Sequence, residues 1–266
     1  MPPYRNDLWA RTMRIVFITQ DDPFYLGESF ESLLSNLPAG VTPAAGCILN
    51  FTPYNKNESL LKKIGRTCKV FGVVFLAQYL LRYAKSIVCA RYRVRRVFAR
   101  HGIPVIEVSG NINSPDFIRQ LKEARPDLIV SVAANVIFRK ELIAAAPLGC
   151  LNVHTALLPK YRGLMPTFWV LKNNEKLTGV SVFFVDEKID NGPILVQKKV
   201  EIRNQTWDEL IRETKRVGMQ AVAEAIVKIQ AGHWAPMAND SAEGTYYSMP
   251  TRQDVLEFLA RGKRFF

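Results

Sequence analysis

The sequence predicts an α/β fold with a Rossmann-like, mainly parallel sheet and helices on both faces. Short β-branched apolar runs alternate with segments of helical periodicity, the pattern that parallel strands and crossover helices produce. The run DLIVSVAA, residues 127–134, is mostly apolar, as are strands that a sheet buries on both faces. No G-x-G-x-x-G follows the first strand, so we expect no dinucleotide signature.

The elements of the first half follow from these patterns in order. RIVFIT, residues 14–19, is the first predicted strand, and a turn follows at residues 20–23. Ser114 before a proline predicts the start of a helix, because a hydroxyl N-cap followed by proline is a common opening. The other predictions here are a helix over SFESLLSNL and strands over AAGCILNF and GIPVIEV.

The second half continues the alternation and then becomes helical. The predicted strands are CLNVH, TGVSVFFVD and ILVQKKVEI, and the short helices are RKELIAAAP, PTFWVLKNN and RQDVLEFLARG. One long helix is predicted over residues 206–230, where TWDE supplies a capping start. We expect a catalytic domain over 1–203 with a basic helical insertion at about 56–101. A C-terminal helix with a small helical or hairpin extension is expected over 204–266.

The net charge of +12 is concentrated in one segment. Residues 56–100 contain twelve lysines and arginines and one acidic side chain. Apolar residues from Val70 to Val88 recur at helical spacing and predict a helix with a broad apolar face. Its continuous apolar part, VFGVVFLAQYLL, is too short to cross a bilayer, and Arg82 and Lys85 interrupt the apolar run. Three interpretations of the segment stay open: contact with RNA, contact with an anionic membrane surface, or a helical pair packed on the domain or on a second subunit of a homodimer.

Composition predicts a cytoplasmic protein with reduced thiols. The four cysteines (Cys47, Cys68, Cys89 and Cys150) are scattered and form no C-x-x-C pair, so we expect no zinc cluster and no other metal site. The N-terminus has no apolar run that precedes a small-residue cleavage site, which predicts no secretory signal.

The strand CLNVH contains the strongest functional signal. Residues i and i+2 of a strand share a face, so Asn152 and His154 should point the same way at the strand's carboxyl end. Open α/β sheets place their sites at that edge. An amide and an imidazole that satisfy each other would be the plainer interpretation of an isolated N-x-H.

The sequence around this strand resembles the folate-dependent formyltransferases. N-x-H in LNVH is followed by L-L-P-x-Y-R-G at residues 157–163 and by I-D-x-G-x-I at 189–194, and the order of the three is specific. This family includes methionyl-tRNA, glycinamide ribonucleotide and amino-sugar N-formyltransferases. The resemblance is densest over residues 127–200. It implies a formyltransferase that uses 10-formyltetrahydrofolate as cosubstrate and has a small-molecule amine as acceptor.

The resemblance implies a catalytic role for three residues, and each role has a chemical reason. Formyl transfer to an amine passes through a tetrahedral oxyanion, to which the Asn152 amide would donate. His154 would take the proton of the attacking amine near neutral pH. Asp190 would hold or polarise the imidazolium and relay protons through water.

Further site residues are implied less directly. Val136, Ile137 and Phe138, with the loop that contains Asp186 and Glu187, would flank the pterin, although core packing and a solvated turn explain these residues nearly as well. Lys160 and Arg162 would contact an acceptor phosphate, or they are exposed loop charges.

For the acceptor, the sequence favours a nucleotide-linked amino sugar. Glycinamide ribonucleotide enzymes have a glycine- and serine-rich phosphate loop after the first strand, where this chain has TQDDPFYLGESF. Only 65 residues follow Glu201, which argues against the additional C-terminal domain of methionyl-tRNA formyltransferases. The alternatives are a methionyl-tRNA formyltransferase, a formyltetrahydrofolate hydrolase and a non-enzymatic basic binding module.

Overall fold

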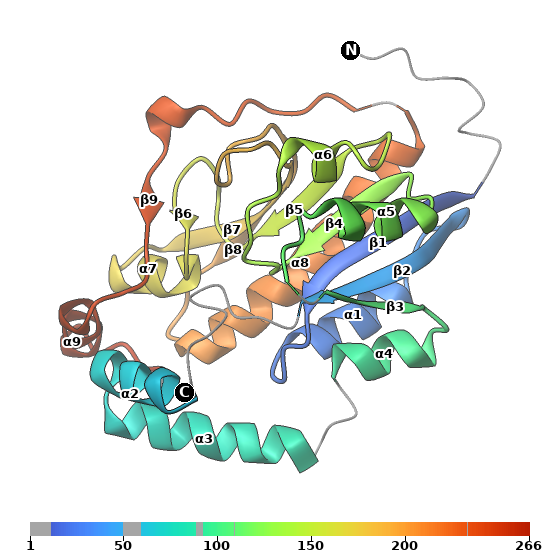
Figure 1. Ribbon diagram of the computed structural model, residues 1–266. Helices are drawn as coiled ribbons and strands as arrows, with labels where there is room; N and C mark the ends of the chain where they lie inside the picture. The colour runs from blue at the N-terminus through green and yellow to red at the C-terminus, as the bar shows by residue number, and fades with distance from the viewer. Residues whose placement is uncertain (1–11, 50–59, 89–92, 109, 233) are drawn as a thin grey trace.

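The computed structural model describes residues 12–49, 60–88, 93–108, 110–232 and 234–266. Its centre is a seven-stranded sheet of order β3-β2-β1-β4-β5-β7-β8 (Figure 1). The pairs from β3 to β5 are parallel, and β7 pairs antiparallel with both β5 and β8. The strands are β1 (Met13–Gln20), β2 (Val41–Leu49), β3 (Val105–Val108), β4 (Leu128–Val132), β5 (Cys150–His154), β7 (Leu177–Phe184) and β8 (Ile194–Glu201).

Helices cover both faces of the sheet, as predicted. α1 (Leu26–Leu34), α4 (Val94–Arg100) and α8 (Trp207–Gln230) pack on one face, and α5 (Pro115–Glu123) and α6 (Lys140–Ile143) on the other. Side chains of β1 alternate between the two cores: Ile15 and Phe17 enter the first, Val16 and Ile18 the second. All four are fully buried, which explains an apolar run without polar alternation.

The two predicted helix starts are confirmed. Ser114 accepts a hydrogen bond from the backbone N–H of Phe117, and a proline occupies the first turn of α5. Thr206 and Glu209 form a reciprocal capping box at the start of α8. These caps satisfy N–H groups that have no partner within the helix itself.

The basic segment forms two helices where the sequence predicted a continuous helical face. α2 (Leu60–Phe71) and α3 (Val73–Val88) are separated by Gly72, whose φ of 91° is accessible mainly to glycine. α4 completes the crossover from β2 to β3, and its Val94, Val97 and Phe98 are buried in the central core. The additional layer in this region is therefore the α2–α3 pair.

The predicted apolar face of α3 points away from the protein, contrary to the usual arrangement. Val73, Val74, Leu81 and Ile87 have 57–73% of their surface exposed. The side that packs inward is aromatic: Phe75, together with Phe71 at the end of α2, is buried in a cluster with Trp207, Phe265 and Phe266. The aromatic face of α3, and not its aliphatic face, therefore packs on the protein.

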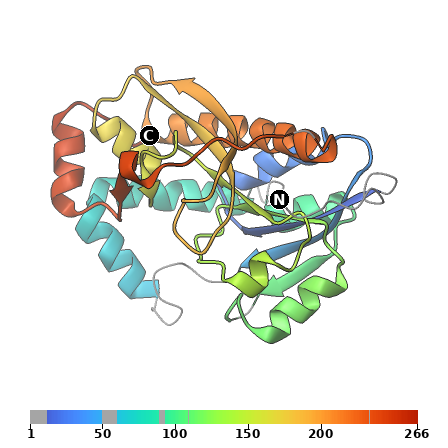
Figure 2. The same ribbon diagram turned by 90° about the horizontal axis from the view of Figure 1, so that it is seen from above.

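The C-terminal extension packs against segments that follow β5 in the chain. α7 (Pro166–Lys172) and α9 (Arg252–Ala260) pack together, and α9 also contacts α2 at one end of the molecule (Figure 2). β9 (Tyr246–Tyr247) pairs in parallel with β6 (Arg162–Gly163), so this strand extends the loop after β5 and forms no hairpin of its own. α8 shares the central core with the sheet. The division at residue 203 stays a prediction.

Parts of the basic segment, including Lys56, Cys89 and Arg91, lie outside the described residues. Within the part of the chain that the structure describes, no helix is long and apolar enough to cross a membrane.

Candidate functional site

A cavity of about 1050 Å³ opens above the carboxyl ends of β1, β4 and β5. Its wall includes Gln20 from the end of β1, Ser131 from β4, and Asn152 and His154 from β5. This is the edge at which open α/β sheets bind ligands. The volume lies at the upper end of the range for small-molecule sites, which leaves room for two ligands side by side.

The three predicted catalytic residues meet in this cavity. Nδ1 of His154 lies 3.5 Å from Oδ2 of Asp190, and the imidazole is 7% exposed. Asn152 lines the same wall, two residues before His154 on the same face of β5. Among the described residues, the Asn152 side chain has no hydrogen-bond partner, which leaves its amide available to a ligand.

The hydrogen bonds of His154 assign different roles to its two nitrogens. Nε2 lies 2.7 Å from the backbone carbonyl oxygen of Tyr161. Because a carbonyl oxygen only accepts, Nε2 carries a proton. Nδ1, which faces Asp190, is then the nitrogen that can gain or lose a proton, and the carboxylate would stabilise the resulting imidazolium.

Asp190 is held in a constrained loop. Its φ of 47° is in the left-handed region, and its Oδ2 accepts a hydrogen bond of 2.9 Å from the backbone N–H of Gly163. The Asn239 side chain in the C-terminal extension donates to the carbonyl oxygens of Asp190 and Gly192, both at 2.9 Å. A Cβ at Gly192 would lie 1.7 Å from the Phe184 carbonyl oxygen, so only glycine fits there.

Four of the five predicted pterin-flanking residues line the cavity: Val136, Ile137, Phe138 and Asp186. The Asn113 side chain donates to the Ile137 carbonyl oxygen, which fixes the backbone of that loop. Ile137 is 57% exposed, whereas Phe138 is 3% exposed and packs in the second core. Glu187 is exposed and is not part of the wall.

The two predicted acceptor contacts lie outside the cavity wall. Lys160 is exposed. Arg162 is buried, and its guanidinium donates to Asn191, Asn239 and Ser241. Arg162 therefore braces the loop of Asp190. Its contact with an acceptor stays a prediction without geometric support.

Lys215 was not predicted and lines the cavity from α8. Burial lowers the pKa of its amine, against the opposing effect of the Asp22 carboxylate. Trp207, Ile211 and Thr214 line the same wall. Their helical spacing with Lys215 marks one face of α8, but only the fold reveals that this face borders a cavity.

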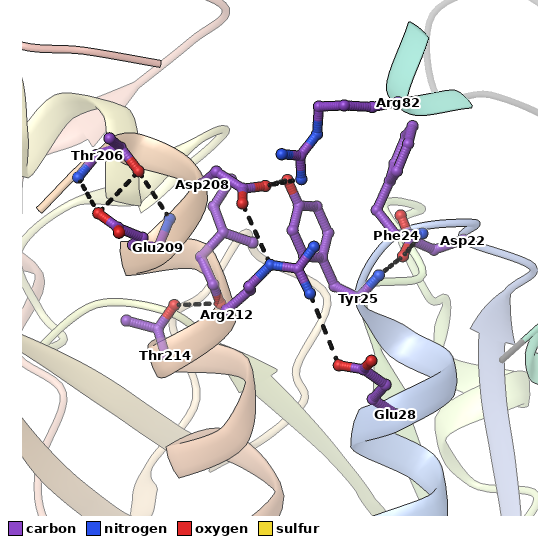
Figure 3. Close-up of polar contacts among 11 residues, drawn as sticks. Asp22, Phe24, Tyr25, Glu28, Arg82, Thr206, Asp208, Glu209, Arg212 and Thr214 are labelled. Atoms are coloured by element: carbon purple, nitrogen blue, oxygen red, sulfur yellow. Dashed lines mark hydrogen bonds and ion pairs between the residues drawn. The ribbon is translucent and has the colours of Figure 1, made fainter. Parts of the chain in front are cut away.

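A partly buried polar network joins the start of α1 to α3 and α8 at the wall of the cavity, which includes Tyr25 (Figure 3). The Tyr25 hydroxyl donates to Oδ1 of Asp208 at 2.6 Å, and Arg82 pairs with the same oxygen at 2.5 Å. Arg212 contacts Oδ2 of Asp208 at 3.2 Å and extends toward Glu28. Burial raises the pKa of Tyr25 well above its usual range, and Asp208 adds to the shift.

Comparison with known proteins agrees with this site. The formyl transferase family model matches residues 84–226, which is more than half of the chain. The chain belongs to the folate-dependent formyltransferase family. A methionyl-tRNA formyltransferase from Kosmotoga olearia is 36% identical over 217 residues, which cover 81% of this chain and 69% of that protein. This chain matches eight curated methionyl-tRNA formyltransferases, including that protein, over 48–69% of their lengths.

Solved structures of formyltransferases share the fold. A sugar N-formyltransferase from Shewanella has a TM-score of 0.59 at 18% identity and covers 94% of this chain and 87% of that chain. A sugar 3N-formyltransferase, WlaRD, crystallised with dTDP and 5-N-formyl-THF, has a TM-score of 0.54 at 16% identity and covers 90% and 70%. The predicted fold, family and formyltransferase class are confirmed.

Proposed function

We propose that this protein transfers the formyl group of 10-formyltetrahydrofolate to a primary amine. The observation that carries the proposal is the convergence of Asn152, His154 and Asp190 on one cavity of a formyltransferase fold. The folate would lie along the loop of Val136 and Ile137, where backbone groups are available to the pterin ring.

In the proposed reaction, each of the three side chains has one role. The amine nitrogen attacks the formyl carbon, and the carbonyl oxygen becomes an oxyanion that accepts a hydrogen bond from the Asn152 amide. Nδ1 of His154 takes the proton that the amine loses, and Asp190 stabilises the imidazolium. The bond from carbon to N10 then breaks, N10 gains the proton, and the products are a formamide and tetrahydrofolate.

For the acceptor we favour a nucleotide-linked amino sugar. Glycinamide ribonucleotide is disfavoured, because the phosphate position that its enzymes have after the first strand is blocked here. Oδ1 of Asp22 accepts hydrogen bonds from the backbone N–H groups of Phe24, Tyr25 and Leu26. An internal carboxylate therefore occupies the place where a helix N-terminus would receive an anion. The likeness to sugar N-formyltransferases, which extends over nearly the whole chain, adds support.

Methionyl-tRNA is the second candidate acceptor, because the matched curated relatives are named methionyl-tRNA formyltransferases. A basic RNA-binding stripe would give it further support. However, four arginines of the segment are paired within the protein: Arg82 with Asp208, Arg93 with Asp21, Arg95 with Glu107, and Arg100 with Glu31. Paired guanidinium groups contribute less to a phosphate contact, which lowers the weight of this candidate.

An acceptor panel distinguishes the two candidates. Formation of tetrahydrofolate from 10-formyltetrahydrofolate is followed with nucleotide-linked 3-amino and 4-amino sugars, with methionyl-tRNA, and without acceptor. We expect turnover with an amino sugar above the rate without acceptor. Turnover with methionyl-tRNA alone would replace the amino sugar by the second candidate. Equal turnover with and without acceptors would identify water as the acceptor and the protein as a hydrolase.

A further inference from the structure

One side of α3 is an aliphatic surface that the protein leaves open. Val73, Val74, Leu80, Leu81 and Ile87 are 44–73% exposed. Their positions along 16 residues fall within one broad face of the helix, and exposed alanines at 77 and 84 lie between them. We call this surface the α3 stripe. A helix of this length extends over about 24 Å.

The opposite side of α3 is anchored firmly to the protein. Phe75 stacks on Phe266 at 5.3 Å between ring centroids, and Tyr79 contacts Phe24 edge-on at 5.3 Å. Arg82 forms the ion pair with Asp208. The α3 stripe is therefore not the inner face of a helix that lacks its partner. It is a second apolar face on a helix already packed.

Exposed basic side chains lie on the helix pair that includes the stripe. Lys69 of α2 and Lys85 of α3 are exposed, and no carboxylate among the described residues forms an ion pair with either. α2 also presents Lys62, Lys63 and Arg66, and it has no acidic residue. By contrast, carboxylates pair with Arg93, Arg95 and Arg100 on the α4 side. Lys69 and Lys85, which pair with no carboxylate of the described residues, thus lie on the same helix pair as the aliphatic stripe.

We propose that the α2–α3 pair binds the surface of an anionic membrane. In this arrangement the α3 stripe enters the boundary between headgroups and acyl chains, and the lysines contact the anionic headgroups. Helices with an aliphatic face and flanking lysines and arginines bind bilayers in this way, parallel to the surface. The inference goes beyond the proposed catalytic function and does not depend on it.

Charge and side-chain type favour a membrane over the other partners. A second copy of this chain would bring the same lysines face to face, which like-charge repulsion opposes. RNA would contact the basic groups but would leave Val73, Leu81 and Ile87 in water, because single-stranded RNA stacks on aromatic side chains. A bilayer satisfies both the aliphatic stripe and the charge.

The test is flotation of the full chain with vesicles of phosphatidylcholine, with or without phosphatidylglycerol. We expect binding to the vesicles that contain phosphatidylglycerol, weakened by salt. Leu81→Glu/Ile87→Glu places two charges in the stripe and should reduce binding at least tenfold, roughly the loss expected when two side chains no longer enter the bilayer. Lys69→Glu/Lys85→Glu should reduce binding to these vesicles by about fivefold or more per lysine.

The matched control is Val227→Glu/Met237→Glu, which replaces two side chains of similar exposure elsewhere, 49% and 47%. It should bind as wild type does, and thermal unfolding of each variant checks the fold. Wild-type protein that binds neither kind of vesicle would overturn the proposal. Equal loss in the control and stripe variants would do the same. A dimer that Leu81→Glu/Ile87→Glu dissociates, with no vesicle binding by wild type, would assign the stripe to self-association.

Discussion

The Tyr161 carbonyl oxygen decides which nitrogen of His154 is basic. Because Nε2 donates to that oxygen, the chemistry falls to Nδ1 and to the Asp190 carboxylate beside it. The same loop thus holds both the imidazole and, through the Gly163 N–H, the carboxylate. The Tyr161 carbonyl oxygen and the Gly163 N–H thus orient His154 and Asp190 before any substrate binds.

The oxyanion role of Asn152 predicts a specific kinetic effect. Asn152→Ala should lower kcat by about 10²–10³-fold, as loss of one oxyanion donor does, while KM for the folate changes little. Steady-state kinetics with the acceptor found in the panel measures both constants. A rise in KM with unchanged kcat would instead make Asn152 a binding residue.

The buried thiols should be inert. Burial raises the pKa of Cys47 to about 12 and that of Cys150 further, whereas Cys68 is only half-buried. In a Cys89→Ser background, iodoacetamide at neutral pH should therefore label Cys68 and spare the other two until the protein unfolds. Mass spectrometry of peptides locates the label. Early labelling of Cys47 would contradict the burial of β2.

Among the elements, the C-terminal extension acts as a brace for the catalytic loop. Asn239 fixes the carbonyl oxygens of Asp190 and Gly192. Asn239→Ala should lower kcat by about tenfold, because a small displacement of a catalytic group is costly, and should leave folate affinity nearly unchanged. Asp240→Ala in the same turn is the matched control. Equal effects of both variants would mean that the turn, and not this brace, matters.

The contact between α1 and α8 predicts a pH dependence of stability. The folded-state pKa of Tyr25 is raised, so its share of the free energy of unfolding is complete below the unfolded value of about 10 and is lost as pH rises above it. The stability difference between wild type and Tyr25→Phe should therefore shrink by roughly 1 kcal/mol per pH unit above about pH 10. Urea unfolding at several pH values measures it. A constant difference would contradict the buried bond to Asp208.

On the scale of the whole molecule, the sequence predicted what local patterns determine. Apolar runs located the strands, Ser114 and Thr206 located two helix starts, and i, i+2 spacing placed Asn152 beside His154. It could not predict that Arg162 turns toward Asn239, because the chain between them spans more than 70 residues. Nor could it orient α3, since both faces are apolar and only packing against Trp207 and Phe266 selects the aromatic one.

The central claim is that His154 and Asp190 act together as the proton acceptor in formyl transfer. The most direct measurement is kcat for formyl transfer by Asp190→Asn, with 5-formyltetrahydrofolate binding measured on the same preparation. The replacement is nearly isosteric, and its amide oxygen can still accept from the Gly163 N–H. We predict a fall in kcat of about 10²–10⁴-fold with folate binding retained. Wild-type turnover in this variant would contradict the claim.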